Sequence, residues 1–256
     1  MHPIERLRHV ARDDGTGPTL LGQDAAAALA GFSQDPAALV TACRRLVDRH
    51  PAAGTIWWVA ARVLGASDPG AEAFACSEQL AADPTAGILA AELPADATVL
   101  VVGWPETAAD ALMRRADVEV LVADGGGADG NYLARRLRAV GVDATEVPDA
   151  GVGSASVAAS LVLVEATAAG PGGLIAAAGS RGAAAVAAHA GVPVWAVVGE
   201  GRVLPRRLWD ALLSRLDASA DPWEGGLDLV PLDLAVDAVG PGGHTAAATV
   251  PNRADC

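Results

Sequence analysis

The stretch Thr98-Val99-Leu100-Val101-Val102-Gly103 decides the fold that the sequence predicts. Four consecutive apolar residues, mainly β-branched, end in a glycine, which is typical of a short strand buried on both faces. Strands of this kind belong to parallel sheets, because helices cover both faces of such sheets. The stretch therefore predicts the first strand of an α/β domain.

Strands and helices alternate downstream of this strand. A helix is predicted from Pro105 to Arg115, and the same order then repeats as far as residue 198. The further strands are predicted at Val118–Val122, Asp143–Val147, Leu161–Glu165 and Pro193–Val198, and the further helices at Tyr132–Val140, Ser154–Ala158 and Ser180–Ala190, with loops at Asp124–Gly130 and through Gly173. This alternation implies right-handed crossovers and a Rossmann-like, mostly parallel sheet with helices on both faces.

The chain before residue 95 has a helical pattern. Ser33-Gln34-Asp35-Pro36 offers a cap followed by proline in the first turn, and the helix after it ends at His50-Pro51. Other helices are predicted at Asp24–Ala30, Pro69–Ala82 and Thr55–Leu64, the last with Trp57 and Trp58, whose usual role is to fill a core or an interface. We therefore predict a small helical domain, residues 1–94, and a Rossmann-like α/β domain, residues 95–256, with an irregular C-terminal tail.

Composition and charge exclude several classes of function. Hydrophobic residues make up 52% of the chain, enough for a sizeable core. A net charge of -13 would repel a phosphate backbone, so no nucleic-acid partner is expected. No apolar stretch approaches the roughly 20 residues of a membrane-spanning helix, and the first residues lack the apolar core of a secretion signal. We expect a cytoplasmic protein without a membrane partner, and the excess of Arg over Lys suggests a bacterial genome rich in GC.

Cysteine and histidine do not form metal-binding patterns. Cys43, Cys76 and Cys256 have no paired spacing, which fits reduced thiols. The five histidines are scattered, without the i, i+4 pairing of helical metal ligands. We predict neither a metal site nor a cofactor.

The candidate site lies in the loops beyond the carboxyl ends of the predicted strands, where parallel sheets bind ligands. Gly125-Gly126-Gly127 either lets the backbone approach a phosphate or forms a flexible turn. Ser180 either starts a helix whose N-terminus binds an anion beside Arg181 or simply caps that helix, and Arg202 is expected to approach the same loop edge. Asp149 either binds a ligand hydroxyl or caps a turn. The predicted ligand-binding set is Gly103, Trp104, Gly125, Gly126, Asp149, Thr167, Gly179, Ser180, Arg181 and Arg202.

Several stretches carry a resemblance to a known family. They are Val162-Leu163-Val164-Glu165-Ala166-Thr167, Gly173 to Ser180, Ala190 to Val197, Val147-Pro148-Asp149-Ala150 and Leu227-Asp228-Leu229-Val230-Pro231. Together they resemble the superfamily that contains the regulatory subunits of initiation factor 2B, methylthioribose-1-phosphate isomerase and ribose-1,5-bisphosphate isomerase. The likeness covers about Thr98 to Gly240, with a looser match in the N-terminal helices, and it implies a dimer.

The residues that the family's isomerases use are absent. The resemblance places Trp104 or its neighbours at the family's cysteine, Thr167 at the aspartate of its Gly-Ala-Asp, and Ala176-Ala177 at its Asn-Lys pair. The arginine of its Ser-Arg-Pro segment falls within Asp124–Gly127. A thiol or carboxylate moves the proton between carbons 1 and 2 of the opened sugar, and a threonine is no base near neutral pH. We therefore expect no isomerisation.

Three functions remain to be compared. The first is a non-catalytic, homodimeric member that binds a phosphorylated sugar, a nucleotide or a protein partner. The alternative is an active aldose-ketose isomerase in which Asp124, Asp129, Asp149 or Glu165 has taken over. The third is a regulatory subunit of the translation type, which the bacterial composition disfavours.

Overall fold

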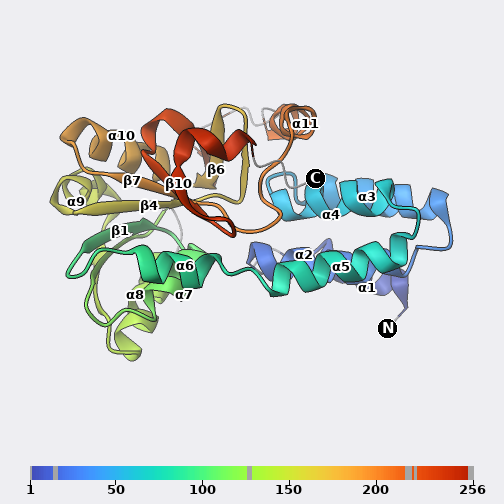
Figure 1. The fold of residues 1–256 in the computed structure, drawn as a ribbon, viewed down its shortest axis with the longest axis horizontal. Coiled ribbons are helices and arrows are strands. Elements are labelled where there is room, and N and C mark those ends of the chain that lie inside the picture. Colours follow the sequence, from blue (N-terminus) through green and yellow to red (C-terminus); the bar gives the residue numbers. More distant parts are fainter. Residues whose placement is uncertain (1, 14–16, 126–128, 217–220, 222–223, 253–256) are drawn as a thin grey trace.

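The computed structural model describes residues 2–13, 17–125, 129–216, 221 and 224–252. A helical bundle at one end of the molecule adjoins a layered α/β part at the other (Figure 1). The helices are α1 (Pro3–Val10), α2 (Pro18–Ala30), α3 (Pro36–Arg49), α4 (Gly54–Gly65), α5 (Pro69–Ala81), α6 (Thr85–Glu92), α7 (Glu106–Leu112), α8 (Asp129–Ala139), α9 (Val152–Ala158), α10 (Ser180–Ala190) and α11 (Arg206–Leu216), with short 3-10 turns η1 (Asp149–Gly151), η3 (Leu232–Leu234) and η4 (Ala247–Asn252). The strands are β1 (Thr98–Val102), β2 (Glu119–Ala123), β3 (Asp143–Val147), β4 (Leu161–Glu165), β5 (Ala168–Gly170), β6 (Gly173–Ala177), β7 (Val194–Val197), β8 (Leu227–Pro231), β9 (Asp237–Gly240) and β10 (Gly243–Ala246).

Helix α4 is largely buried within the helical bundle. It is apolar on nearly all sides, and such a helix is stable only where other helices surround it. Trp58 is fully buried and Trp57 nearly so, which confirms that both fill the core. The predicted cap before α3 is also confirmed, because Asp35 accepts hydrogen bonds from the N–H groups of Ala37 and Ala38.

Two helices pack against the other domain from the one to which the sequence assigned them. Helix α6 packs on α7 and β9, and its Leu89 belongs to the core beside the large sheet. Helix α11 instead adds Trp209 and Leu212 to the core of the bundle. The division at residue 94 stays a prediction, and the packing of α6 favours a boundary nearer Asp83.

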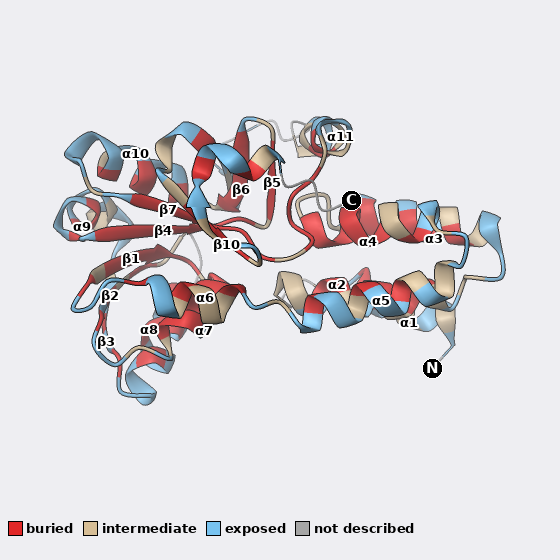
Figure 2. Ribbon diagram, viewed as in Figure 1, coloured by how far each residue is buried: buried red, intermediate tan, exposed pale blue. Residues whose placement is uncertain are grey.

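The large sheet has the strand order β10-β9-β7-β4-β1-β2-β3. Its strands run parallel except β10, which is antiparallel to β9. Helices α6, α7 and α8 cover one face, and α9 and α10 cover the other (Figure 1). Figure 2 shows how completely the central strands are buried between these layers. The predicted mostly parallel α/β fold is confirmed.

A small second sheet corrects two sequence-based expectations. Strands β5, β6 and β8 form an antiparallel sheet where a loop through Gly173 was predicted. The C-terminal tail is not irregular either, because it supplies β8 to this sheet and β9 and β10 to the large one. These strands are short, several of them are rich in glycine and alanine, and they pair with distant segments. Local periodicity therefore does not reveal them.

Several predicted helix ends also move. Helix α8 begins at Asp129 rather than Tyr132, and the carboxylate of Asp124 accepts the N–H of Gly130 in its first turn. Helix α7 is shorter than the predicted Pro105–Arg115. Among the described helices, none has both the length and the apolar character that a bilayer crossing requires.

Candidate functional site

The strand order of the large sheet reverses at β1. Strands β2 and β3 lie on one side of β1, and β4, β7 and β9 lie on the other, with Val99 paired to Val120 of β2 and to Leu161 of β4. Loops diverge beyond the carboxyl ends of the strands at such a reversal, and the resulting gap is where open parallel sheets bind ligands. The candidate site therefore lies beyond Val102 and Glu165, the last residues of β1 and β4.

One hollow at this edge, called the crevice below, has a volume of about 410 Å³. It is lined by Val102, Gly125, Asp149, Val152, Gly153, Ala178, Gly179, Gly182 and Val186. Gly125 and Gly179 have φ angles of 70° and 92°, which side chains rarely allow, and a Cβ on Gly125 would lie 3.1 Å from Cγ1 of Val102. Glycine is thus required where the loops approach β1. The structure brings together three of the predicted site residues, Gly125, Asp149 and Gly179.

Asp149 supplies the charged group of the crevice. It is exposed in the short turn η1, directly after β3. Its carboxylate makes no hydrogen bond or ion pair with any residue that the structure describes, so the capping role considered for it is wrong. A free carboxylate beside a hollow can accept hydrogen bonds from the hydroxyl groups of a ligand.

The first turn of α10 faces the same crevice through Gly179 and Gly182. Gly179 is the N-cap, so the expected capping role of Ser180 is wrong, and Ser180 is instead the buried first residue of the helix. The carboxylate of Asp228, on β8, accepts the backbone N–H of Arg181 at 2.9 Å. One of the free donors expected at this helix end is therefore already bound within the chain, while the Arg181 residue itself is exposed.

A smaller cavity of about 80 Å³, called the inner cavity below, lies between the crevice and the bundle. Its lining is Pro18, Val102, Trp104, Pro105, Glu106, Leu163, Glu165, Thr167, Ala177 and Ser180. The hydroxyl of Thr167 donates to the carbonyl of Ile175 at 3.2 Å, and the ring of Trp104 stacks at 5.1 Å from that of Tyr132. Of the predicted site residues, Trp104, Thr167 and Ser180 thus line the inner cavity, whereas Gly125, Asp149 and Gly179 line the crevice. The two hollows share only Val102, and Arg181 lines neither. Gly103 turns the chain after β1 with a φ of 70° and lines neither of them.

Arg202 forms a buried ion pair with Glu165, a residue that lines the inner cavity. Arg202 Nη1 lies 2.7 Å from Oε1 of Glu165, and Nη2 donates to the hydroxyl of Thr107 at 2.9 Å. Glu165 also accepts the backbone N–H groups of Thr107 and Ala108 at the start of α7. Arg202 has no exposed surface, so the expectation that it approaches the loop edge as a ligand donor is wrong.

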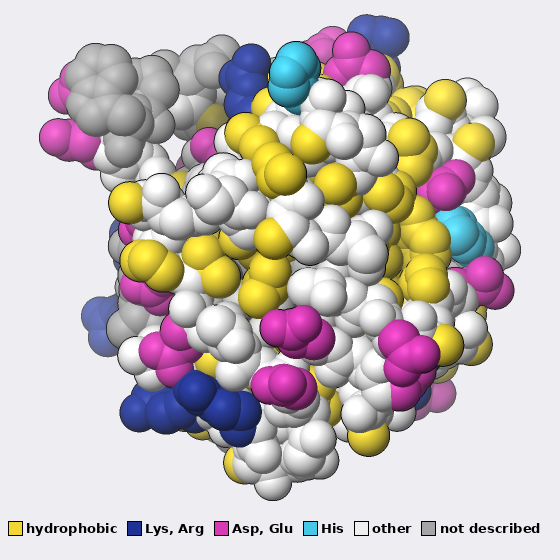
Figure 3. Space-filling view, turned by 90° about the vertical axis from the view of Figure 1, so that its left-hand side faces the viewer, with side chains coloured by type: hydrophobic (Ala, Val, Ile, Leu, Met, Phe, Trp, Pro, Cys, Tyr) yellow, Lys and Arg dark blue, Asp and Glu magenta, His cyan; other side chains and the backbone are white. Residues whose placement is uncertain are grey.

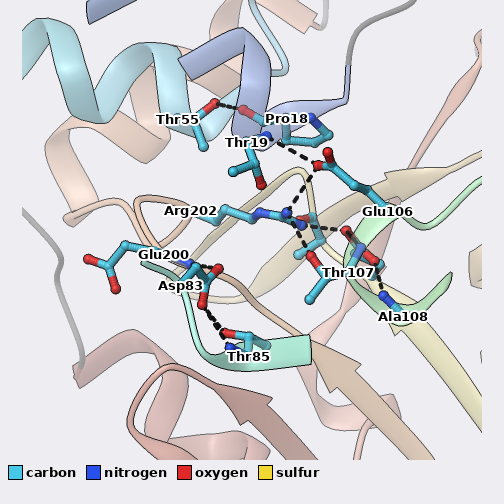
Figure 4. Close-up of polar contacts among 12 residues, drawn as sticks. Pro18, Thr19, Thr55, Asp83, Thr85, Glu106, Thr107, Ala108, Glu200 and Arg202 are labelled. Atoms are coloured by element: carbon cyan, nitrogen blue, oxygen red, sulfur yellow. Dashed lines mark hydrogen bonds and ion pairs between the residues drawn. The ribbon is translucent and has the colours of Figure 1, made fainter. Parts of the chain in front are cut away.

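Acidic residues around this pair tie the bundle to the sheet. Glu106 accepts the N–H of Thr19 in the first turn of α2 and lies 3.9 Å from Arg202 Nη2. Asp83 accepts the N–H of Glu200 at 2.8 Å (Figure 4). Sequence reasoning considered Glu165 as a catalytic carboxylate and did not foresee these contacts. The available signal was a charged residue ending an otherwise apolar strand, which in a buried position requires a partner.

Gly126 lies outside the described residues, and so does the side chain of Asp129. In the described part of the chain no three His, Cys, Asp or Glu side chains are grouped so as to hold a metal ion. The two described cysteines, Cys43 and Cys76, are buried in the bundle far along the chain from the crevice.

Comparison with known proteins gives matches in structure only. No family model matches the chain, and no curated protein matches it. The translation initiation factor eIF-2B of Pyrococcus horikoshii OT3 superposes with a TM-score of 0.79 at 16% identity, over 95% of this chain and 96% of that one. A chain of the tetrameric eIF2B-beta2-delta2 complex from C. thermophilum superposes with a TM-score of 0.79 at 19% identity, over 98% and 92%.

This chain has the initiation factor 2B fold. The delta subunit of eIF-2B from A. fulgidus agrees, with a TM-score of 0.61 at 15% identity over 97% of this chain and 88% of that one. The superpositions include both the bundle and the sheet, because each one covers nearly the whole of this chain. The resemblance that the sequence motifs indicated is thus confirmed in the fold.

Proposed function

We propose that this protein of the initiation factor 2B fold is a non-catalytic binding protein that holds a phosphorylated sugar or a nucleotide in the crevice. The observation that carries the proposal is that the free carboxylate of Asp149 and the first turn of α10 line the same crevice. A ribose phosphate has hydroxyl groups at one end and an anion at the other, and each end suits one of these two features.

The anion would lie against Gly179 and Gly182. The positive end of a helix dipole favours a phosphate, and the absence of side chains on both glycines allows close approach to the backbone. Arg181 is exposed next to this turn and can add a charged hydrogen bond.

Catalysis is disfavoured because the other described carboxylates are engaged. Glu165 accepts hydrogen bonds from two backbone N–H groups and pairs with Arg202, so it is not free to accept a proton from a substrate. Asp124 binds the first turn of α8. Of the carboxylates considered for an active isomerase, Asp149 alone remains without a partner within the described residues, and that alternative would depend on it.

The test is a thermal-shift screen of the whole chain with ribose phosphates and nucleoside monophosphates. A ligand that binds only the folded state raises the melting temperature as its concentration exceeds the dissociation constant. The affinity for the best compound is then measured for Asp149→Asn, which should weaken binding by about tenfold through loss of a charged hydrogen bond.

Asp143→Asn is the matched control. Asp143 is an exposed residue that begins β3, whereas Asp149 follows the carboxyl end of the same strand. Equal affinity for the wild-type chain, Asp149→Asn and Asp143→Asn would contradict the proposed site, and a screen without any stabilising compound would contradict the function.

Self-association through the sheet domain is part of the proposal. The C. thermophilum relative was solved in a tetrameric complex. Here the face opposite the bundle exposes apolar side chains with scattered acidic ones (Figure 3). Val157 on α9 and Val140 after α8 are each more than half exposed, and burial against a second copy would remove such surfaces from water.

A further inference from the structure

A groove lined by arginines runs between α1 and α3, in the helical bundle and away from the crevice. Arg8 and Arg12 of the α1 segment face Arg45 and Arg49 of α3 around a hollow of about 220 Å³. An adjoining hollow of about 300 Å³ continues along α1 between Glu5, His9 and the same Arg8 and Arg12. The four arginines are called the arginine groove below.

No carboxylate among the described residues forms an ion pair with an arginine of the groove. Within the described residues, Arg8, Arg12 and Arg45 make no hydrogen bond or ion pair, and Arg49 donates only its Nε–H, to the carbonyl of Ala11. Other arginines of this acidic chain have carboxylate partners, as in Arg62–Glu72, Arg115–Asp117, Arg138–Glu146 and Arg202–Glu165.

Repulsion between the four arginines lowers the stability of the bundle. Arg45 and Arg49 are four residues apart on α3, and like charges at this spacing on a helix repel each other. Arg8 lies on α1 and Arg12 in the turn that follows it. Packing α1 on α3 adds repulsion between the two pairs. An arrangement that weakens the fold and contacts little within the chain is typical of a surface that meets an external anion.

We propose that the arginine groove binds a short anionic peptide segment of a partner protein, either rich in Asp and Glu or phosphorylated. Arg45 and Arg49 are separated by about 6 Å along α3. Alternate side chains of an extended peptide are separated by about 6.6 Å, so consecutive anionic groups on one face of the peptide match the arginines. Guanidinium groups bind carboxylates and phosphates through two parallel hydrogen bonds.

The shape and charge of the molecule favour a short peptide over other anions. The two hollows form an open groove rather than an enclosed pocket, which suits a chain better than a small molecule. A nucleic acid would extend beyond the groove over a protein of net charge -13, whereas a short segment meets only charges within about 8 Å, the screening length in physiological salt.

The experiment measures the binding of labelled eight-residue peptides to the whole chain by fluorescence anisotropy in 50 mM salt. One peptide alternates Glu with Ser, a second carries phosphoserine in place of Glu, and a third carries Gln in place of Glu. Tripolyphosphate and a single-stranded DNA of eight nucleotides are tested alongside. We expect the first or second peptide to bind more tightly than the Gln peptide and than both other anions, with an affinity that falls as salt rises.

Variants locate the site. Arg8→Gln with Arg45→Gln should weaken peptide binding roughly tenfold or more, because two charged hydrogen-bond donors are lost. The matched control, Arg135→Gln with Arg136→Gln, removes two exposed arginines of α8 at the other end of the molecule and should leave binding unchanged. Arg8→Lys with Arg45→Lys keeps the charge and should give an intermediate affinity.

Stability provides a second readout. The Arg8→Gln, Arg45→Gln variant should melt at the same or a higher temperature than the wild-type chain, since repulsion is relieved. A lower melting temperature with unchanged binding would overturn the proposal, because it would show that the arginines stabilise the folded protein and do not bind the peptide. Equal loss of binding in the α8 control, tighter binding of tripolyphosphate or DNA than of either anionic peptide, or no binding of those peptides would overturn it as well. None of these results depends on the crevice.

Discussion

The guanidinium of Arg202 lies 2.7 Å from the carboxylate of Glu165, and the two side chains are almost completely buried. The pair joins the end of β4, the start of α7 and the loop after β7, three segments that meet beside the reversal of the strand order. An ion pair in this position fixes the loops that form the wall of the inner cavity.

Replacement of Arg202 by Met should lower the free energy of unfolding by about 3 to 5 kcal/mol, because Glu165 would be left as an unpaired buried charge. Urea unfolding measures the effect. The double variant Arg202→Met, Glu165→Gln keeps an acceptor for the N–H groups of α7 without the charge, and it should recover part of the loss. A single variant as stable as the wild type would show that the pair is not formed in solution.

Two glycine substitutions should have opposite effects. A Cβ on Gly170 would overlap the indole of Trp209, so Gly170→Ala should destabilise the protein by about 1 to 3 kcal/mol. A Cβ on Gly182, within α10, would meet no atom within 4 Å, so Gly182→Ala should stabilise it by about 0.5 to 1 kcal/mol. Thermal unfolding of both variants checks the signs, and a Gly170→Ala variant as stable as the wild type would contradict the packing of β5 on α11.

Alkaline pH should destabilise the bundle through its thiols. Burial raises the pKa of Cys43 to about 12 and that of Cys76 to about 11, from 9.0 in the unfolded chain. The folded state therefore binds these protons more tightly. The stability they contribute is complete below pH 9 and is lost as the pH rises towards the folded pKa values. Urea unfolding at pH 8 and pH 10.5 should differ by on the order of 1 kcal/mol per thiol, and Cys43→Ala should reduce that difference.

The protein should not interconvert aldose 1-phosphates and ketose phosphates. Thr167 donates its hydroxyl to a backbone carbonyl, and Glu165 is paired with Arg202, so neither is free to move a proton between neighbouring carbons. The assay follows methylthioribose-1-phosphate and ribose-1,5-bisphosphate with the purified chain. Turnover that disappears in Asp149→Ala would instead establish the isomerase alternative.

The chain should form a dimer or a larger assembly at micromolar concentration. Light scattering distinguishes this from a monomer of 25.6 kDa. Val157→Asp should reduce the measured mass, because a charge on the exposed face of α9 opposes burial against a second copy. Detection of the monomer alone for the wild-type chain would contradict self-association.

Sequence patterns were sufficient for the parts of the fold that local chemistry determines. Strands Asp143–Val147 and Leu161–Glu165 and helix Ser180–Ala190 have the bounds that the sequence predicted. Leu161–Glu165 is marked by a dense apolar run, and Ser180–Ala190 by the glycines that flank it, Gly179 and Gly191. The small sheet was missed because β6 pairs with β8, at least 50 residues further along the chain, and neither strand has a distinctive local pattern.

The site was predicted less well, for a related reason. Gly125, Asp149 and Gly179 could be placed at one edge because the rule for parallel sheets locates every such loop. The partner of Arg202 could not be foreseen, since Glu165 lies 37 residues away and the two meet only when β4 and β7 are paired. A sequence shows which residues carry charge, whereas burial and partners depend on the assembled sheet.

The contribution of α11 to the bundle has a consequence for the order in which the chain can fold during synthesis. Trp209 and Leu212 complete the core of helices that are made first. These helices therefore leave the ribosome with part of their apolar surface uncovered and stay so until α11 has been made. Strand β7, once made, likewise lacks its neighbour β9 until residues 237–240 have been made. A nascent chain halted before residue 209 would therefore present both an apolar helix surface and an unpaired strand edge, the two features that chaperones bind.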